Sequence, residues 1–281
     1  MPEPVLGAVR AGVDTFGALT SGQRLAPDFI VLGAQRAGTT TMFRLLSEHP
    51  QVVRPTASKG IGFFDLNYDK GMRWYLGHFP LEVVARRKVA DGAAHTFESS
   101  GYYLFHPMAA ERMARDLPGV TVIAMVRDPV DRAYSAHSHE LGRGFETEPF
   151  ERALELEEQR LAGAHQRLTS DPRFHSFEHR HHAYLARGRY AEQIERYVAA
   201  MGAERVVIVD ADAFFADPQT EFGELCRRLG LREWRPEKVE RWNARSRETM
   251  SADLRQRLMD HFAPHDEHLA RLMGRTPSWR A

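Results

Sequence analysis

Residues 33–41 read GAQRAGTTT and combine residue types that bind an anion. The two glycines allow a tight loop whose backbone N–H groups fold around a phosphate or sulfate group. Arg36 adds a positive side chain, and Thr39 and Thr40 add hydroxyl donors. A helical pattern follows, so the positive end of a helix dipole would face the same anion. The segment predicts a phosphate-binding turn, and the alternative is a strand-to-helix turn that binds nothing.

The spacing of this turn argues against hydrolysis of a nucleoside triphosphate. It reads G-x-x-x-x-G-T-T, whereas the phosphate loop of a nucleoside triphosphatase reads G-x-x-x-x-G-K-[ST]. Thr39 stands where that loop has the lysine that holds the β- and γ-phosphates, so the clamp on those phosphates is missing.

A second segment could hold a second phosphate. Residues 125–140 read MVRDPVDRAYSAHSHE and follow another apolar run. Arg127 comes where open α/β sheets bind ligands, and Pro129 suits the first turn of a helix. Ser135 lies one to two turns into that helix, so a guanidinium and a hydroxyl could hold one phosphate from two sides. The alternative is a local ion pair between Arg127 and Asp128, with Ser135 on the surface.

Hydrophobic periodicity predicts the elements that position these segments. It predicts buried strands at Asp28–Leu32, Thr121–Val126 and Arg205–Asp210, and a strand end at Thr96–Glu98. It predicts helices at Thr39–Glu48, Gly71–Phe79, Pro107–Leu117, Val130–Leu141, Tyr184–Met201, Pro218–Leu229 and 251–273. Residues 142–180 have no consistent period, and we expect helix and mobile surface there. The alternation of strands and helices predicts an α/β fold with a parallel sheet.

The composition is typical of a globular protein. The 281 residues are 43% hydrophobic, and no apolar run approaches the roughly 20 residues that span a membrane. Lys plus Arg and Asp plus Glu each number 38, so no net charge attracts nucleic acid or an anionic membrane. The single Cys226 excludes a disulfide framework and a multi-cysteine metal site, and favours a cytoplasmic location. The N-terminus does not have the pattern of a signal peptide, and we expect a lead-in at 1–26 and one domain at 27–281. The oligomeric state is not specified by these features.

Together the two phosphate-binding segments resemble the phosphosulfate-binding and 3′-phosphate-binding motifs of the sulfotransferase family. The resemblance continues in order from about residue 27 to residue 279. KGIGFFDLNYDKGMRWYLGHFP at 59–80 is similar to the K-E-x-H-F-F-D…G-x-x-W-Y segment of heparan-sulfate-type sulfotransferases and their bacterial relatives. FESSGYYL at 97–104, RGRYAEQIERYV at 187–198 and HLARLMGRTPSW at 268–279 resemble three further segments of that group.

This resemblance implies a P-loop-like three-layer sandwich with a central parallel sheet between helices. It implies 3′-phosphoadenosine 5′-phosphosulfate as donor, without a metal, and a hydroxyl or amine of a small-molecule, lipid or carbohydrate acceptor. By position, the residues that would hold the 5′-phosphosulfate are Arg36, Ala37, Gly38, Thr39 and Thr40. Those that would hold the 3′-phosphate are Arg127 and Ser135, with Arg245 in the basic stretch NARSR (Asn243–Arg247) as a further candidate.

The chain departs from the family pattern near the acceptor. Gly60 and Gly62 replace the Glu and His of K-E-x-H-F-F-D, and Ser99 replaces the lysine of the E-K-[ST]-P segment. The usual carboxylate base is therefore missing. We expect these changes to disfavour a glycosaminoglycan acceptor, and the two glycines could leave room for a bulkier one.

Four side chains are candidates for catalysis. Arg36 and Lys59 could stabilise the transferred sulfonate or the leaving phosphate, although Lys59 could equally be an ordinary solvated lysine. Glu98 could accept the proton of the acceptor, or it could be a structural carboxylate paired with an arginine. His139 lies four residues after Ser135, so it faces the same side of the helix and could be a base, or an exposed histidine.

Two other functions stay open at this point. A small-molecule or nucleoside kinase is disfavoured by Thr39, and a nucleotide-phosphate binding protein without turnover is kept open by the loss of the base at Gly60. The remaining histidine clusters have no metal-binding pattern, and we interpret them as surface residues: His179, His181 and His182, and His261, His265 and His268.

Overall fold

The computed structural model describes residues 12–55, 58–90, 93–236, 239 and 250–281. In this part of the chain one sheet has four strands, β1 (Phe29–Gly33), β2 (Phe97–Ser99), β3 (Thr121–Val126) and β4 (Val206–Asp210). Their order is β2-β1-β3-β4, and every neighbouring pair is parallel. The three predicted strands and the predicted strand end are confirmed.

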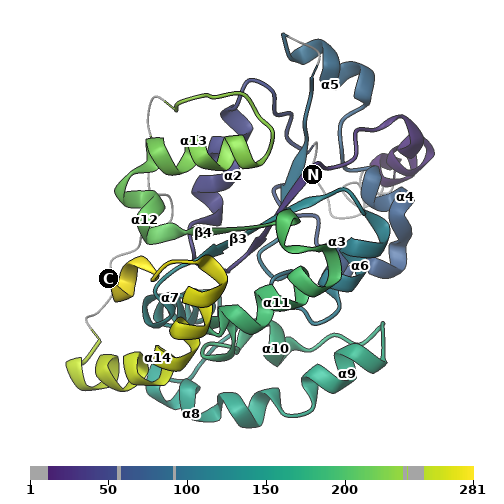
Figure 1. Cartoon of the computed structure of the whole chain (residues 1–281). Coiled ribbons are helices and arrows are strands. Elements are labelled where there is room, and N and C mark those ends of the chain that lie inside the picture. Colours follow the sequence, from purple (N-terminus) through teal and green to yellow (C-terminus); the bar gives the residue numbers. More distant parts are fainter. Residues whose placement is uncertain (1–11, 56–57, 91–92, 237–238, 240–249) are drawn as a thin grey trace.

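Helices cover both faces of this sheet, which confirms the three-layer α/β sandwich (Figure 1). On one side are α2 (Thr39–Glu48), α12 (Ala211–Ala216) and α13 (Pro218–Arg228). On the other are α6 (Ala109–Asp116) and α11 (Tyr190–Met201), with α7 (Pro129–Leu141) and α14 (Ala252–Met273) beside them. Since both faces are covered, β1, β3 and β4 are almost wholly buried and read as nearly continuous apolar runs rather than alternating ones.

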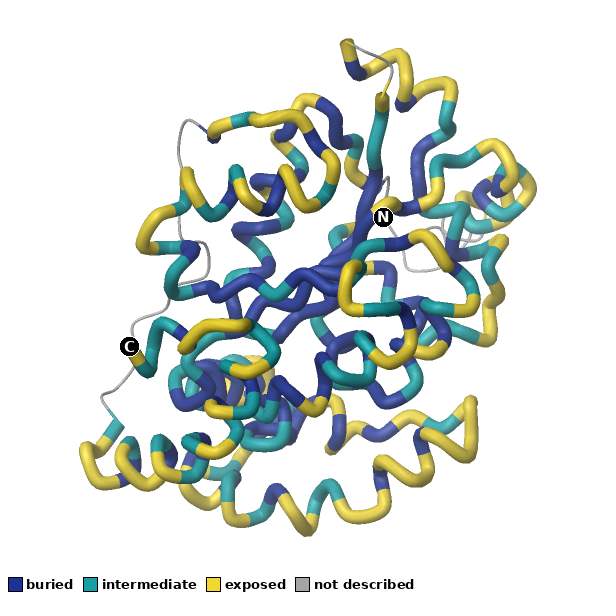
Figure 2. Tube along the Cα trace, viewed as in Figure 1, coloured by how far each residue is buried: buried dark blue, intermediate teal, exposed yellow. Residues whose placement is uncertain are grey.

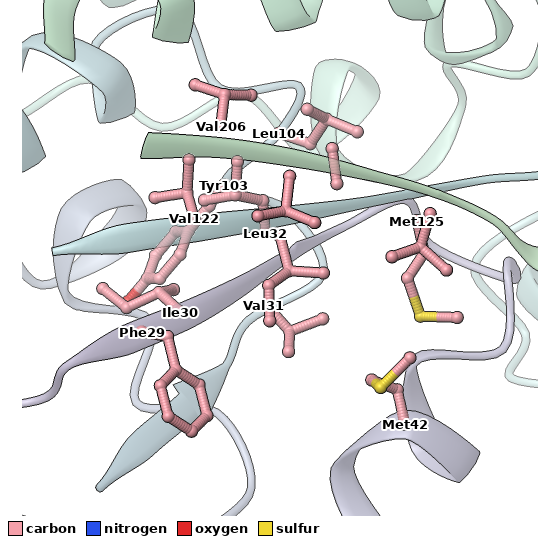
Figure 3. Packing of buried hydrophobic residues seen from close by; sticks show 14 of the residues in the cluster. Phe29, Ile30, Val31, Leu32, Met42, Tyr103, Leu104, Val122, Met125 and Val206 are labelled. Atoms are coloured by element: carbon pink, nitrogen blue, oxygen red, sulfur yellow. The ribbon is translucent and has the colours of Figure 1, made fainter. Parts of the chain in front are cut away.

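The main hydrophobic core lies on the two faces of the sheet. Phe29 to Leu32 of β1 are at most 1% exposed and pack with residues of α2, α6 and α11. Figure 3 shows Met42 of α2 reaching toward Met125 of β3. A second cluster joins α7, α8 (Phe150–Leu161) and α14 through Val130, Ala153 and Phe262. In Figure 2 the buried strands cross the centre, and the outer sides of α8 and α14 are exposed.

The segment expected to be helix and mobile surface is more regular than its sequence pattern indicates. It contains α8, α9 (Ala164–Ser170) and α10 (Phe177–His181). The helix predicted from Tyr184 begins instead at Tyr190, after the 3-10 helix η3 (Ala186–Gly188). The physical reason is Glu157, whose carboxylate accepts the backbone N–H groups of Tyr184, Leu185 and Ala186 at 2.9, 2.7 and 2.8 Å. These bonds hold the backbone in a loop at that point.

Shorter elements surround the sheet edge next to β2. They are η1 (Ser21–Gln23), α3 (Phe63–Leu66), η2 (Tyr68–Lys70), α4 (Gly71–Leu76) and α5 (Glu82–Lys88). Residues 12–19 of the expected lead-in are helical and pack on α4, where Trp74 Nε1 donates to Asp14 at 3.1 Å. The other 3-10 helices are η4 (Ala203–Arg205) and η5 (Ser278–Arg280).

Two observations bear on the predictions made from composition. Among the described residues, no helix has the length and apolar character needed to cross a membrane. Cys226 is buried in the core. The cytoplasmic location and the division at residue 26 stay predictions.

A glycine provides a sharp test of this packing. A Cβ atom on Gly188 of η3 would lie 2.5 Å from the ring of Phe262, which is fully buried and cannot swing into solvent. Gly188→Ala should therefore lower the free energy of unfolding by about 1–3 kcal/mol, measured by urea denaturation. Gly223→Ala in α13 is the matched control, because nothing lies within 4 Å of its Cβ position, and it should be neutral or stabilising by up to about 1 kcal/mol. Equal losses in the two variants would contradict this packing.

Candidate active site

A cavity of about 680 Å³ opens at the carboxyl ends of all four strands. Its wall includes residues that directly follow each strand: Gln35 and Arg36 after β1, Ser100 to Tyr102 after β2, Arg127 after β3 and Asp212 after β4. The strand order reverses between β1 and β3, since β2 lies on one side of β1 and β3 on the other. Such a switch point is where open parallel sheets bind ligands.

The turn after β1 has the backbone of an anion-binding loop. Arg36 and Gly38 both have left-handed backbone, with φ of 73° and 85°. Gly38 has a further constraint, because a Cβ there would lie 2.8 Å from the ring of Phe215. The 10-residue helix α2 begins directly after it and directs its positive end toward the turn. This arrangement of left-handed residues before a helix start favours a phosphate or sulfate group.

The side chain of Gln35 fixes this turn to α7 and η3. Its amide nitrogen donates to Glu140 Oε1 at 2.9 Å, and its oxygen accepts from Arg187 at 2.7 Å. Glu140 and Arg187 are 0% and 4% exposed. Sequence patterns had not indicated any of these three residues.

The predicted phosphate-binding side chains lie together. Arg36 Nε donates to Ser135 Oγ at 3.0 Å, and Arg127 donates to the backbone oxygen of Arg36 at 3.4 Å. Arg127 also pairs with Asp131 at 3.5 Å and with Asp212 at 3.8 Å. Asp128, which the sequence offered as an ion-pair partner of Arg127, instead caps α7. Arg127 pairs with Asp131 and Asp212 in its place.

Lys59 reaches the start of α2. Its Nζ donates to Thr39 Oγ1 at 3.0 Å and to Thr40 Oγ1 at 3.3 Å. Burial lowers the pKa of Lys59 to about 8. The interpretation as an ordinary solvated lysine is therefore wrong, because this ammonium is held at the phosphate-binding turn.

Gly60 does not open space for an acceptor, contrary to the sequence-based expectation. Lys59 O accepts the N–H of Ser99 at 2.9 Å, so the chain runs against the end of β2 at this point. A Cβ on Gly60 would lie 2.7 Å from the backbone oxygen of Ser99. The glycine permits this close backbone approach, whereas Gly62 has left-handed backbone (φ 63°) and directly precedes α3.

Glu98 lies beneath the cavity rather than on its wall. It is 0% exposed, and its carboxylate accepts from Ile61 N, Ser100 Oγ and Tyr103 Oη at 2.9, 2.7 and 2.8 Å. Burial raises the pKa of Glu98 against the opposing effect of these bonds. The geometry fits a structural carboxylate, paired with hydroxyls and an amide rather than with an arginine, and gives an acceptor no direct access to it.

Asp65 is a cavity residue that the sequence analysis missed. It is 5% exposed, and its Oδ1 accepts the N–H of Leu66 at 2.6 Å. Burial is the main cause that raises the pKa of Asp65 to about 7. One feature of the sequence could have indicated Asp65: it is the last residue of the K-G-I-G-F-F-D segment, at the start of a short helix.

Residues of α7 and of the α10 region complete the wall. Ser135, His139 and Arg143 follow one another at intervals of four, the first two on α7 and Arg143 in the turn after it, and all three line the cavity. This confirms that His139 faces the same side as Ser135. Among the described residues, the cationic side chains of the wall are Arg36, Lys59, Arg127, Arg143, Arg180 and Arg187, against the carboxyl groups of Asp65 and Asp212. The cavity is therefore suited to an anion. The stretch around Arg245 lies outside the described residues.

The interpretation of the first histidine cluster as surface is wrong. His179, His181 and His182 are 4, 7 and 9% exposed. His179 Nδ1 bonds to the hydroxyl of Tyr102 at 2.7 Å, and His182 Nε2 bonds to a backbone oxygen at 2.8 Å. His181 Nδ1 lies 3.0 Å from Glu140 Oε2, and its ring lines the cavity.

The second histidine cluster lies on α14, away from the cavity. His265 and His268 pair with Glu192 and Glu195 of α11 at 3.7 and 2.7 Å. Within the described ranges, no group of three or more His, Cys, Asp or Glu side chains is arranged to hold a metal ion.

Comparisons with known proteins agree on one family. Residues 26–271 match the family model described as the sulfotransferase domain. The bifunctional heparan sulfate N-deacetylase/N-sulfotransferase 4 of Mus musculus is 30% identical over 210 residues, which are 73% of this chain and 22% of the relative. The corresponding protein 3 of Homo sapiens is 27% identical over 285 residues, or 90% of this chain and 31% of the relative. The chain thus spans less than a third of the length of these curated relatives.

A solved structure matches over nearly its whole length. The crystal structure of a sulfotransferase from Alicyclobacillus acidocaldarius is 30% identical, with a TM-score of 0.65. The match covers 91% of this chain and 99% of that one.

The ionisation of Asp65 predicts a pH-dependent stability. An unfolded aspartate loses its proton near pH 4, whereas folded Asp65 keeps it to about pH 7. Its contribution to the free energy of unfolding is thus full below about pH 4 and is lost as the pH rises to about 7. Relative to Asp65→Asn, the wild-type protein should lose roughly 2–3 kcal/mol between about pH 5 and about pH 8, measured by urea denaturation.

The matched control is Asp69→Asn, which changes an exposed aspartate four residues away. This variant keeps Asp65, so it should lose stability between about pH 5 and about pH 8 as the wild-type protein does. A pH-independent difference between Asp65→Asn and the wild-type protein would show that Asp65 is ionised in the folded protein, against this account.

Proposed function

Because the chain belongs to the sulfotransferase family, we propose that it transfers a sulfuryl group from 3′-phosphoadenosine 5′-phosphosulfate to a hydroxyl or amine. The observation that carries the proposal is the pair of phosphate-binding segments at the switch point of the sheet. The turn at Arg36 follows β1, and Arg127 follows the adjacent β3; Arg36 bonds to Ser135 through its side chain and to Arg127 through its backbone oxygen. One nucleotide with phosphates at both its 5′ and 3′ positions suits this pair.

In this proposal the 5′-phosphosulfate lies on the turn. Arg36, the amides of Ala37 and Gly38, and the hydroxyls of Thr39 and Thr40 hold it, and Arg127 with Ser135 holds the 3′-phosphate. The excess of cationic side chains on the wall favours an anionic donor. When the donor binds, its phosphate groups replace Ser135 as the partner of Arg36. They also compete with the carboxylates of Asp131 and Asp212 for Arg127.

Catalysis would rest mainly on positioning and electrostatic stabilisation. As the sulfuryl group leaves, negative charge grows on the oxygen that bridges it to the 5′-phosphate. Lys59 is within reach of the start of α2, where that oxygen would lie, and Arg36 is on the turn itself. A partly desolvated ammonium stabilises such charge more than one in water does.

The acceptor must also lose a proton. Of the two bases considered from the sequence, His139 is on the cavity wall, whereas Glu98 is covered by its hydrogen-bond donors. The two curated relatives are N-sulfotransferases of heparan sulfate by name, which supports an amine as one acceptor class. We propose a small-molecule, lipid or carbohydrate acceptor that carries an amine or a hydroxyl.

The 3′-phosphate is the feature that separates this donor from other adenosine nucleotides. The protein should bind adenosine 3′,5′-bisphosphate much more tightly than AMP in calorimetry. Arg127→Ala should weaken bisphosphate binding by about tenfold to a hundredfold, because a charge-assisted contact is lost, and should change AMP binding little. Arg152→Ala, an exposed arginine of α8, is the control and should bind both ligands as the wild-type protein does. Equal affinities of the wild-type protein for AMP and the bisphosphate would contradict the proposed donor.

The lowered pKa of Lys59 gives the donor site a pH dependence. Its charge is present below about pH 8 and is lost as the pH rises, so affinity for the bisphosphate should fall by about tenfold in alkaline solution. Lys59→Met should bind more weakly at neutral pH and lack this fall, whereas Lys88→Met, at an exposed position of α5, should keep it. A wild-type affinity that stays constant from pH 7 to 10 would remove Lys59 from the donor site.

A further inference from the structure

Glu140 is shared between the phosphate-binding turn and an imidazole on the cavity wall. Its Oε1 accepts from the side chain of Gln35 at 2.9 Å, and its Oε2 lies 3.0 Å from His181 Nδ1. Gln35 directly precedes Arg36. A single buried carboxylate therefore fixes the position of the His181 ring relative to the turn on which the donor would lie.

The charge of Glu140 sets the tautomer of His181. Burial raises the pKa of Glu140, but the hydrogen bonds from His181 and Gln35 outweigh it, so this pKa lies below its ordinary value. An ionised carboxylate can only accept, so the neutral imidazole must carry its hydrogen on Nδ1. Its lone pair is then on Nε2, the nitrogen that can take a proton from a molecule in the cavity.

The ring is also confined by its neighbours. Phe145 packs against it with ring centroids 4.7 Å apart, and Phe177 does so at 4.6 Å. Confinement between two rings and a buried carboxylate holds the imidazole in one orientation. A base that is oriented in this way by a third group is the arrangement that proton abstraction requires.

We propose that His181 is the general base of the sulfuryl transfer and that Glu140 is its positioning residue. As the electron pair of the acceptor oxygen or nitrogen forms its bond to sulfur, the acceptor proton passes to His181 Nε2. The bond between sulfur and the bridging oxygen breaks, and its electron pair stays on the 5′-phosphate of the leaving bisphosphate. The imidazolium that forms is stabilised by Glu140. The dyad takes the role left open by Gly60, and this inference rests on the proposed function.

Several charged groups face the dyad and set its pH dependence. Arg143, in the turn after α7, lies 3.4 Å from Glu140, and the buried Arg187 of η3 donates to Gln35. Arg180 precedes His181 on α10 and lines the cavity. The base must be neutral to act, so the rate should fall as the solution becomes acidic.

The test measures formation of adenosine 3′,5′-bisphosphate from the donor, with saturating glucosamine as probe. Glucosamine has an amine and hydroxyl groups, and water is the competing acceptor, so the readout counts transfer to any of them. His181→Gln should lower the rate by about 10²–10⁴-fold and remove the loss of rate at acidic pH. Its affinity for the bisphosphate should stay within about twofold of the wild-type value.

Two further variants separate a chemical role from a structural one. His182→Gln changes the next residue, a buried histidine bonded to a backbone oxygen, and should keep the wild-type rate and pH profile. Glu140→Gln should move the acidic loss of rate to lower pH and lower the rate less than His181→Gln, because the imidazole remains.

The outcomes are distinct. A wild-type rate and pH profile in His181→Gln, equal losses in the His181 and His182 variants, or loss of the acidic limb in His139→Gln instead, would each overturn the dyad. A wild-type protein that binds the bisphosphate and forms no product would contradict the proposed function itself, and the dyad with it.

Discussion

The side-chain amide of Gln35 lies between two buried groups of opposite charge. It donates to Glu140 and accepts from Arg187, and both of these charged residues are buried. Buried charges are tolerated only when they are paired and hydrogen-bonded, and an amide side chain can donate to the carboxylate with its nitrogen while its oxygen accepts from the guanidinium. The backbone of the phosphate-binding turn is therefore held by the same bonds that keep α7 and η3 in place.

One short segment braces both phosphate-binding sites. In the R-G-R-Y sequence, Arg187 reaches Gln35 on the first site, and the hydroxyl of Tyr190 donates to the backbone oxygen of Arg127 on the second at 2.9 Å. Gly188, between them, lets the segment lie against Phe262. In the proposed function these two sites hold the two phosphates of one donor, and their separation is set by these bonds before the donor binds.

The turn, Arg127 and Ser135 could be predicted from sequence because each is encoded locally, as an apolar run, a turn and a helix start. The pair of His181 and Glu140 could not be predicted in this way, because the role proposed for His181 depends on its contact with Glu140, 41 residues away in the sequence. When a histidine lies in a polar stretch of sequence, hydrophobic periodicity does not indicate whether its ring is buried or exposed. Glu98 was placed near the site correctly, but its burial depends on hydroxyls such as that of Tyr103, which pattern alone does not position.

In the proposed function, the cavity at the switch point moves a sulfuryl group from the phosphosulfate donor to an acceptor. This transfer is tested most directly by incubating the protein and the donor with a metabolite extract and measuring masses. The account predicts that at least one metabolite gains the mass of one SO₃ group, that bisphosphate forms in equal amount, and that Arg36→Ala abolishes both. Tight binding of the donor with no such gain in any metabolite, and no bisphosphate, would contradict it.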